Sequence, residues 1–274
     1  MKTKFFIPIG IALIFMFCKP VLAGNDSIPE KIVEIQTSFG TMKVKLYNET
    51  PQHRDNFLKL VGQGFYDELL FHRVIKDFMV QGGDPDSKNA RPGRQLGGGD
   101  LGYEIPAEFN QALFHKKGAL SAARTSDEVN PEKKSSASQF YIVQGKTYTN
   151  ETLDMLIDRR KQQAIKIETD KLVKAKQSEI KRLQKLPVRD SLNAFLDVIY
   201  QEAEAKANVS LFEVDSIKRE VYTTVGGTPF LDGAYTVFGE VIEGLEIIDS
   251  IANVSVDRND RPVQDIKMRI KVSQ

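Results

Sequence analysis

The sequence of 274 residues has few of the side chains that carry redox or metal chemistry. It contains one cysteine, three histidines and no tryptophan. A single cysteine cannot form an intramolecular disulfide, and Cys18 lies within the apolar N-terminal segment. His53, His72 and His115 stand alone, without the spacing of a metal-binding motif. We therefore expect no metal and no cofactor.

An excess of charge of one sign is also absent. The chain carries 38 basic and 37 acidic residues, for a net charge of +1. This balance gives no argument for nucleic acid or an anionic surface as a partner. Hydrophobic residues make up 41% and charged residues 27%, which is ordinary for a soluble globular protein with a sizeable core.

Long apolar runs are confined to the N-terminus. Two lysines precede an apolar stretch over residues 5–17, and small residues then stand at the −3 and −1 positions of a cleavage site that ends at Ala23. This layout is typical of a secretory signal peptide. We therefore predict a leader over residues 1–23, a linker over 24–30, and a mature protein that is periplasmic or secreted.

Two alternatives would keep the protein at a membrane. The leader would remain as an uncleaved anchor, although the apolar stretch is short for a span of about 20 residues. Lipidation of Cys18 is the other alternative, and it is disfavoured because Phe17, rather than a small residue, precedes the cysteine.

Most of the chain up to residue 148 is predicted to be β-structure. Residues 31–47 alternate with period two on both sides of Gly40, which predicts a hairpin. Thr50-Pro51 then supplies an N-cap and a first-turn proline for a helix. Short β-rich runs follow, separated by glycine-rich loops such as 96–102, as in a barrel or sandwich. These runs cover residues 70–74, 78–81, 119–123 and 139–143.

Glycine is missing between Asn150 and Glu220, and Pro187 is the one proline there. Leucine and isoleucine recur at helical spacing on both sides of this proline. Ser210-Leu211-Phe212-Glu213 is similar to a capping box and would open a third helix. This segment is predicted to be a bent hairpin of helices.

The β-like pattern returns from Thr223, with a strand over 235–241, a short helix over 245–251 and a last strand over 263–272. The simplest account is one β-rich domain, residues 31–148 and 222–274, interrupted by a helical insertion over 149–221. Loops tolerate such insertions because the entropy cost of closing a loop grows slowly with its length.

Three blocks of sequence resemble the cyclophilin family. They are Phe71–Asp84 (FHRVIKDFMVQGGD), Ser138–Ile142 (SQFYI), and Phe230–Gly233 (FLDG) followed by Val237–Gly239 (VFG). The resemblance covers the β-rich domain but not the insertion. It implies a closed antiparallel eight-stranded barrel with two capping helices. It also implies a bacterial, exported peptidyl-prolyl cis/trans isomerase whose partners are proline-containing polypeptides.

The resemblance further implies roles for individual residues. Arg73 would be the catalytic donor, and Gln81 would hold it in place. Arg124 would act on a bound peptide through its backbone. The residues expected to line the proline pocket or the peptide groove are Phe78, Met79, Ala123, Arg124, Gln139, Tyr141, Phe230, Leu231 and Tyr235.

Three of these positions depart from the commoner family pattern. Phe230 stands where many eukaryotic cyclophilins carry tryptophan, Tyr235 where they carry histidine, and Tyr141 where phenylalanine is commoner. We expect turnover to survive these changes. Without the indole N–H donor, tight cyclosporin binding is in doubt.

The reaction makes modest chemical demands. The barrier to rotation about an X–Pro bond is about 20 kcal/mol, because rotation removes the delocalisation of the nitrogen lone pair. A 10⁵-fold acceleration requires roughly 7 kcal/mol. A guanidinium in a water-poor site, directed at the twisted nitrogen, would supply about 3 kcal/mol of this. Clamping of the substrate would supply the rest.

A second interpretation belongs to a different functional class. The protein would be a proline-peptide binding module or chaperone, with residues 150–220 holding clients or a partner, or associating with a second copy. Arg73 favours the enzyme, since a binding module needs no donor to a twisted nitrogen. Charged helix faces of this kind are most often simply solvated, which favours the enzyme without a binding role for the arm.

Overall fold

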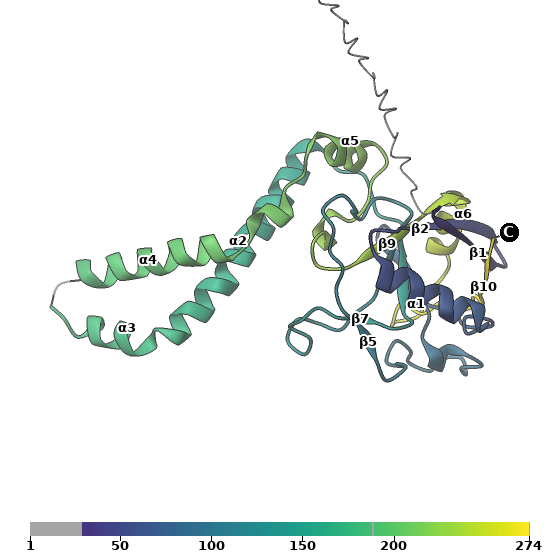
Figure 1. Cartoon of the computed structure of the whole chain (residues 1–274), viewed down its shortest axis with the longest axis horizontal. Coiled ribbons are helices and arrows are strands. Elements are labelled where there is room, and N and C mark those ends of the chain that lie inside the picture. Colours follow the sequence, from purple (N-terminus) through teal and green to yellow (C-terminus); the bar gives the residue numbers. More distant parts are fainter. Residues whose placement is uncertain (1–28, 188, 274) are drawn as a thin grey trace, which may run out of the picture.

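The computed structural model describes residues 29–187 and 189–273. A curled β-sheet body carries a helical arm that extends away from it (Figure 1). The expected leader, Cys18 and the linker up to residue 28 lie outside the described residues. Within the described part of the chain, no helix has the length and apolar character needed to cross a membrane.

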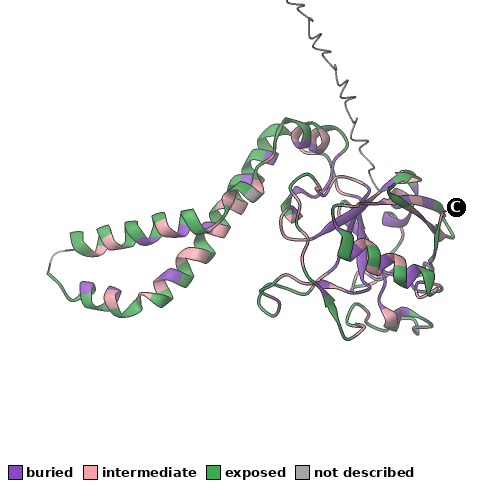
Figure 2. Cartoon of the chain, in the orientation of Figure 1, coloured by how far each residue is buried: buried purple, intermediate pink, exposed green. Residues whose placement is uncertain are grey.

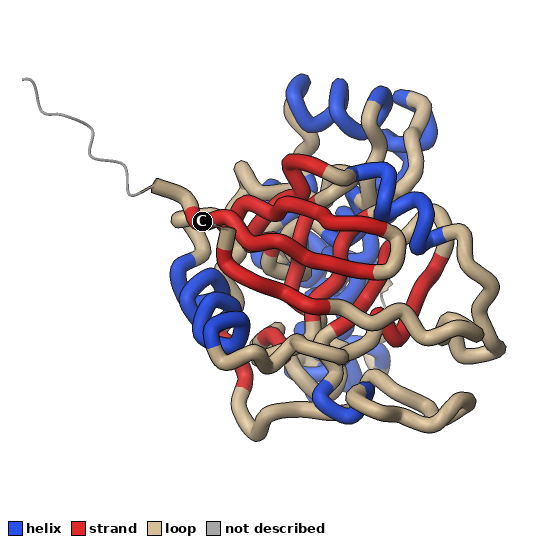
Figure 3. The backbone as a smooth tube through the Cα atoms, turned by 90° about the vertical axis from the view of Figure 1, so that its right-hand side faces the viewer, coloured by secondary structure: helices blue, strands red, loops and turns tan. Residues whose placement is uncertain are grey.

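Eight antiparallel strands form one curled sheet in the order β10-β1-β2-β9-β6-β8-β4-β3 (Figure 3). They are β1 (Lys31–Thr37), β2 (Gly40–Leu46), β3 (Phe71–Ile75), β4 (Met79–Gly82), β6 (Ala119–Ala122), β8 (Phe140–Val143), β9 (Val237–Glu243) and β10 (Arg269–Val272). The short strands β5 (Glu104–Ile105) and β7 (Ser135–Ser136) pair apart from this sheet. The predicted hairpin is confirmed, with Lys31 opposite Leu46 and Thr37 opposite Gly40.

The two edges of the sheet meet through irregular segments. Leu70 and Lys267 form an isolated bridge, and the N–H of Phe71 donates to the carbonyl of Ile266 at 2.9 Å. The last strand is therefore shorter than predicted, because residues before Arg269 form this seam instead of a regular ladder. The eight-stranded sheet agrees with the predicted fold class.

Two helices cover the sheet, as predicted. Helix α1 (Pro51–Gly62) packs against β9 and β10, and α6 (Leu245–Ala252) packs against β2, β3 and β4. The enclosed core is purple in Figure 2. Its side chains with no exposed surface include Val33, Ile35, Met42, Val44, Leu46, Val80, Leu120, Ile142 and Ile248. Complete burial of one such side chain contributes about 1.5–3 kcal/mol.

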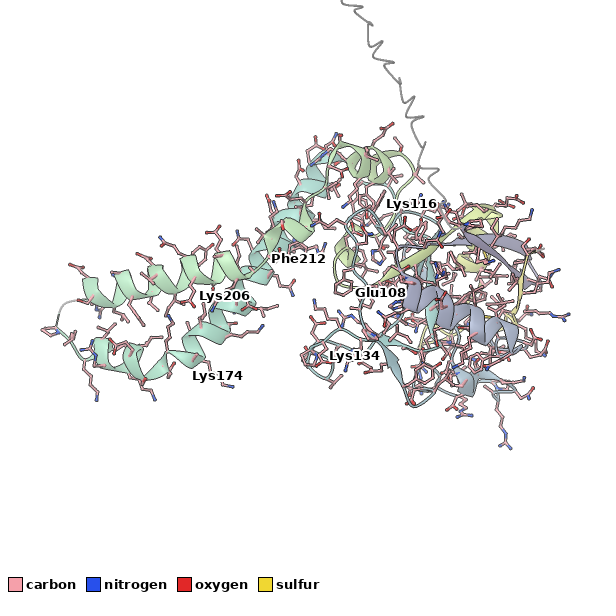
Figure 4. The ribbon with its side chains drawn as sticks, viewed as in Figure 1. Glu108, Lys116, Lys134, Lys174, Lys206 and Phe212 are labelled. Carbon is pink, nitrogen blue, oxygen red and sulfur yellow. The ribbon has the colours of Figure 1, made fainter. Side chains whose placement is uncertain are left out.

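The start of α1 differs from the prediction. Thr50 precedes the helix, but its side chain makes no capping hydrogen bond. The carboxylate of Glu108 instead accepts hydrogen bonds from the backbone N–H groups of Gln52 and His53, at 3.1 and 3.0 Å. A negative group is favoured at a helix N-terminus. Glu108, labelled in Figure 4, is distant in sequence, so no local pattern indicates this cap.

The helical arm covers residues 150–224. It consists of α2 (Asn150–Ala175), α3 (Gln177–Gln184), α4 (Asp190–Lys206), η2 (Val209–Phe212) and α5 (Ser216–Thr224). Helices α2 and α4 pack against each other around a small cluster that includes Ile165, Leu172 and Ile199. The predicted helical hairpin is thus present, and α3 follows α2 after a break at Lys176.

The predicted capping box at Ser210 is wrong. Residues Val209–Phe212 form a 3₁₀ turn, and the next helix, α5, begins at Ser216. Its cap is the carboxylate of Asp215, which accepts from the N–H of Lys218 at 2.8 Å. Aspartate is as good an N-cap as serine, and the helix therefore begins after Asp215, five residues beyond the predicted cap.

Candidate active site

Arg73 and Gln81 lie opposite each other on the neighbouring strands β3 and β4. An Nη1–H of Arg73 donates to Oε1 of Gln81 at 3.3 Å. Directly opposed residues point to the same face of a sheet, so the register of this short hairpin is what brings the two side chains together.

Gln139 extends this contact into a chain of hydrogen bonds. The Nε2–H of Gln81 donates to Oε1 of Gln139 at 3.1 Å. Nε2 of Gln139 in turn donates to the carbonyls of Gly97 and Gly99, at 3.1 and 2.8 Å. Gln139 is expected to line the peptide groove, and its amide is in addition hydrogen-bonded within the protein, where it fixes the orientation of Gln81.

Asp84 anchors the glycine-rich loop that receives this chain. Its carboxylate is fully buried and accepts hydrogen bonds from the backbone N–H groups of Asp86, at 2.8 Å, and Gly97. A Cβ atom at Gly99 would lie 2.2 Å from Oδ1 of Asp84. The loop approaches so closely that only glycine fits there.

Asp260 is the second charged neighbour of Arg73. Its carboxylate lies 3.7 Å from Nε of the arginine, and the two side chains are 45% and 42% exposed. The guanidinium is therefore at the rim of the site and in contact with solvent. The water-poor setting expected for Arg73 is not present in the peptide-free protein.

An apolar cluster lies next to the arginine. Met79, Ala123 and Tyr141 are buried in it. The partly buried side chains packed against them are Phe78, Leu231 and Tyr235. Six of the predicted pocket and groove residues, from four separate segments of the chain, thus meet at one place.

Phe230 forms the outer rim of this cluster. Its side chain is 40% exposed, and its ring centroid lies 5.5 Å from that of Phe78. It belongs to the one-turn helix η3 (Pro229–Leu231), which also carries Leu231. The position of η3 therefore sets the width of the pocket on this side.

Tyr141 is tied to a buried polar network that the sequence did not reveal. Nδ1 of His115 lies 2.8 Å from the carboxylate of Asp232, and Nε2 lies 3.0 Å from the hydroxyl of Tyr141. A carboxylate only accepts, so Nδ1 donates to it, and in a neutral imidazole Nε2 accepts from the tyrosine. Burial raises the pKa of Tyr141 well above its usual value. The network keeps this hydroxyl out of the pocket.

The side chain of Arg124 forms its hydrogen bonds within the protein. It donates to the carbonyls of Ala234 and Thr125, both at 2.8 Å, and its guanidinium lies 4.4 Å from the ring centroid of Tyr235. Among the described residues, its backbone groups have no hydrogen-bond partner. This arrangement suits the expectation that Arg124 offers its backbone to a peptide.

A cavity of about 460 Å³ begins at Gln81, the partner of Arg73, and follows the glycine-rich loop. Gln81, Ala123, Arg124 and Gln139 line one side, and residues 97–104 line the other. The site therefore combines an apolar cluster, a cation held by Gln81 and a groove with peptide hydrogen-bonding groups. Such a site suits an extended peptide with one compact apolar residue.

Comparison with known proteins identifies the family. The sequence profile described as "Cyclophilin type peptidyl-prolyl cis-trans isomerase/CLD" matches residues 32–171 and 203–272. The chain therefore belongs to the family of cyclophilin-type peptidyl-prolyl cis-trans isomerases.

Curated relatives occur in staphylococci. A Staphylococcus haemolyticus protein named as a peptidyl-prolyl cis-trans isomerase is 30% identical over 236 residues, which cover 85% of this chain and 86% of the relative. A Staphylococcus epidermidis protein of the same name is 31% identical over 246 residues, covering 88% and 92%.

The solved structures agree on the fold. The crystal structure of a cyclophilin-type isomerase from Cryptosporidium parvum has a TM-score of 0.52 and 20% identity, covering 90% of this chain and 99% of the other. A structure of that isomerase in the presence of the dipeptide Ala-Pro has a TM-score of 0.51, 20% identity and coverages of 89% and 99%.

Proposed function

We propose that this isomerase accelerates X–Pro rotation in exported polypeptides, with Arg73 stabilising the twisted amide nitrogen. The observation that carries the proposal is the hydrogen-bonded chain from Gln139 through Gln81 to Arg73, beside the apolar cluster. A surface arginine loses entropy when it is fixed. Because the hydrogen-bonded chain holds the guanidinium of Arg73 in one orientation despite this cost, we infer that the orientation is important for function.

The nitrogen of a twisted X–Pro bond regains its lone pair and becomes a hydrogen-bond acceptor. A guanidinium N–H directed at it forms a bond that the planar substrate lacks, so the gain is specific to the transition state. Nη1 of Arg73 is held by Gln81, and Nη2 makes no hydrogen bond with any described residue. Nη2 is the nitrogen that would face the substrate.

Asp260 is too weak a partner to prevent this. An exposed ion pair contributes about 0–1 kcal/mol, and here both side chains are nearly half exposed. A bound peptide would cover the guanidinium and lower the local dielectric constant, which strengthens the new bond. Asp260 contacts the Nε edge and thus leaves the Nη edge to the substrate.

The remainder of roughly 4 kcal/mol would come from holding the substrate in a partly twisted form. Phe78, Met79, Tyr141 and Leu231 would clamp the proline ring, and the backbone of Arg124 would hold the neighbouring residue. The Ala-Pro dipeptide named with the Cryptosporidium parvum isomerase supports a proline peptide as the ligand class.

We further propose that the protein works outside the cytoplasm, in the periplasm or after secretion. The support is the leader-like sequence over residues 1–23, with Cys18 as the less favoured lipid attachment point. We propose that residues 149–221 are an insertion in the cyclophilin domain. The helices α2 to α5 between the strands β8 and β9 support this proposal.

A proline-isomerisation assay on an Ala-Pro tetrapeptide tests the role of Arg73. We expect Arg73→Ala to lower kcat/KM by about 100-fold, as for loss of an oxyanion donor, and Arg73→Lys to recover only part of it. Arg258→Ala is the matched control, since it removes an exposed positive charge from the loop of Asp260. No turnover by the wild type, or equal loss in both alanine variants, would refute the proposal.

A holding function for the arm remains a second candidate. Ile167, Leu196, Val198 and Tyr200 of α2 and α4 are exposed apolar side chains, and such surface can bind an unfolded chain. An aggregation assay with an unfolded, proline-free client separates the two functions. Suppression by Arg73→Ala at the wild-type level would show holding without isomerisation.

A further inference from the structure

Helix α2 of the arm reaches the wall of the candidate proline pocket through one side chain. Nη1 of Arg160 donates to the carbonyl of Pro229 at 2.9 Å, and Nη2 donates to the carbonyl of Asp232 at 2.5 Å. These two carbonyls flank Phe230 and Leu231. The arginine therefore grips the segment that carries both pocket residues.

The two carbonyls need such a donor. They lie at the start and just after the end of η3, a single 3₁₀ turn. The carbonyl of Asp232, beyond the end of the turn, has no partner inside it. The N–H of Asp232 reaches the carbonyl of Pro229 only at 3.3 Å. A planar guanidinium presents several N–H groups in a rigid fork and can bridge two acceptors, whereas a lysine offers one point.

The guanidinium itself is held in place from the arm. It lies 4.3 Å from the ring centroid of Phe212, a favourable cation–π distance. Figure 4 labels Phe212 where the arm approaches the sheet body. Among the described residues Arg160 forms no ion pair, so its charge is directed at the carbonyls and the aromatic ring.

The other end of the arm holds the same segment. The hydroxyl of Tyr222, in α5, donates to the carboxylate of Asp232 at 2.6 Å. The second carboxylate oxygen accepts from His115, whose ring also meets Tyr141. Both helices that join the arm to the sheet thus contact the loop after η3, and one route continues to a pocket residue.

Apolar packing makes this junction rigid. Leu153 and Ile157 of α2 and Tyr222 of α5 form a buried cluster. Phe114 and Tyr148, from outside the arm, pack against it. Arg160 lies one turn beyond Ile157, so the direction of its side chain is set by helix packing against the sheet body.

We propose that Arg160 is a positioning residue of the isomerase, and that the root of the helical arm forms the outer support of the proline pocket. Arg160 sets the distance of Phe230 and Leu231 from Phe78. The residue acts on substrate only through this wall. The inference depends on the proposed pocket, but not on the role of Arg73.

The test compares Arg160→Ala and Arg160→Lys with Arg159→Ala in the full-length protein. Arg159 is the preceding residue of α2, is exposed, and makes no hydrogen bond or ion pair with the described residues. All three variants are assayed with the Ala-Pro tetrapeptide, and its dissociation constant is measured separately by titration.

We expect Arg160→Ala to raise KM and the dissociation constant by about tenfold, with kcat changed less than threefold. Phe230 and Leu231 would contact the proline ring whether the bond is planar or twisted, and Phe78, Met79 and Tyr141 remain in place to hold the partial twist. Arg160→Lys should recover part of the affinity, and Arg159→Ala should equal the wild type. A simple loss of folded protein would instead lower the apparent kcat at constant KM.

Amide chemical shifts supply a readout independent of turnover. Those of Phe230 and Leu231 should move in Arg160→Ala and not in Arg159→Ala. Unchanged KM, affinity and shifts in Arg160→Ala would overturn the inference while leaving the proposed function intact. Absence of turnover in the wild type would overturn the proposed function, and the titration and shifts would still decide the inference.

Discussion

The sheet body and the distal part of the arm are held together in different ways. In the sheet body, strands that are distant in sequence share one core, and many of its side chains have no exposed surface. In the arm beyond Arg160, a narrow seam around Ile165, Leu172 and Ile199 is bordered by exposed residues, which are green in Figure 2. Many of its ion pairs are exposed, and such pairs contribute about 0–1 kcal/mol each.

This difference places the boundary between the rigid part and the locally unstable part of the molecule inside the arm, and not at its junction with the sheet. Leu153, Ile157 and Tyr222 are packed against Phe114 and Tyr148 of the sheet body, so the root of the arm shares the stability of the sheet. The distal hairpin has only its own seam. The molecule therefore pairs a rigid scaffold, which the pocket needs, with an extension that is free to open locally.

Cavity-forming substitutions should show the largest difference between the two regions. Leu120→Ala, at a site with no exposed surface in the sheet core, should lower the free energy of unfolding by about 3–4 kcal/mol. Ile199→Ala, equally buried in the arm, should loosen the hairpin and leave turnover intact. Urea unfolding followed in parallel by turnover and far-ultraviolet circular dichroism measures both effects. Equal shifts of one shared transition in the two variants would refute the division.

Acid should weaken the sheet body before it weakens the distal hairpin. Burial lowers the pKa of His72 to about 4, with Asp84 opposing the shift and Arg73 and Arg261 adding to it. Its unfolded pKa is about 6.5. Between these two pKa values His72 is protonated in the unfolded chain and neutral in the folded protein. The free energy of unfolding therefore decreases as the pH falls from about 6.5 to about 4.

The size of this loss is about 3 kcal/mol for His72. Burial also lowers the pKa of His53, which adds to the loss in the same direction. The arm contains no histidine. Denaturant titrations at pH 7.5 and 4.5 on wild type and His72→Leu measure this loss of unfolding free energy. An equally steep pH dependence in His72→Leu would show that this histidine is not responsible.

The sequence predicted the sheet and the helical hairpin because their signals are local. Alternation gives the strands around Gly40, and helical spacing gives α2 and α4. The candidate site was found only through its resemblance to a family. Two side chains support the site through hydrogen bonds between segments that are distant in sequence. Gln139 donates to the glycine-rich loop, and Arg160 donates to η3. Neither hydrophobic periodicity nor secondary-structure propensity encodes such long-range contacts. The hydrogen bonds of these two side chains were therefore not predicted.

Removal of the distal hairpin should have a small effect on catalysis. Replacing residues 164–208 with a short glycine-serine linker leaves Arg160, Phe212 and α5 in place. Because these residues support η3 and the hairpin does not contact the pocket, kcat/KM for a tetrapeptide should stay within about twofold of the wild type. A tenfold loss with unchanged unfolding of the sheet body would place the remote hairpin in the catalytic machinery.

The smallest expected effect concerns one ion-pair network in the hairpin. The carboxylate of Glu202 lies 2.8 Å from Nζ of both Lys176 and Lys206, and these two ammonium groups lower its pKa to about 2. Its contribution to stability is complete above about pH 4.5 and is lost as the pH falls towards 2. Lys206 is labelled in Figure 4.

Glu202→Gln should therefore lower the melting temperature of the arm slightly at pH 7 and low salt, and hardly at all at pH 2 or in 1 M salt, which screens exposed charges. Turnover should not change. Glu204→Gln is the matched control, because Glu204 forms no ion pair with the described residues. The network joins Lys176, between α2 and α3, to α4. Equal melting of the two variants at pH 7 would therefore mean that the apolar seam alone holds the hairpin, and the contrast with the sheet body would be sharper still.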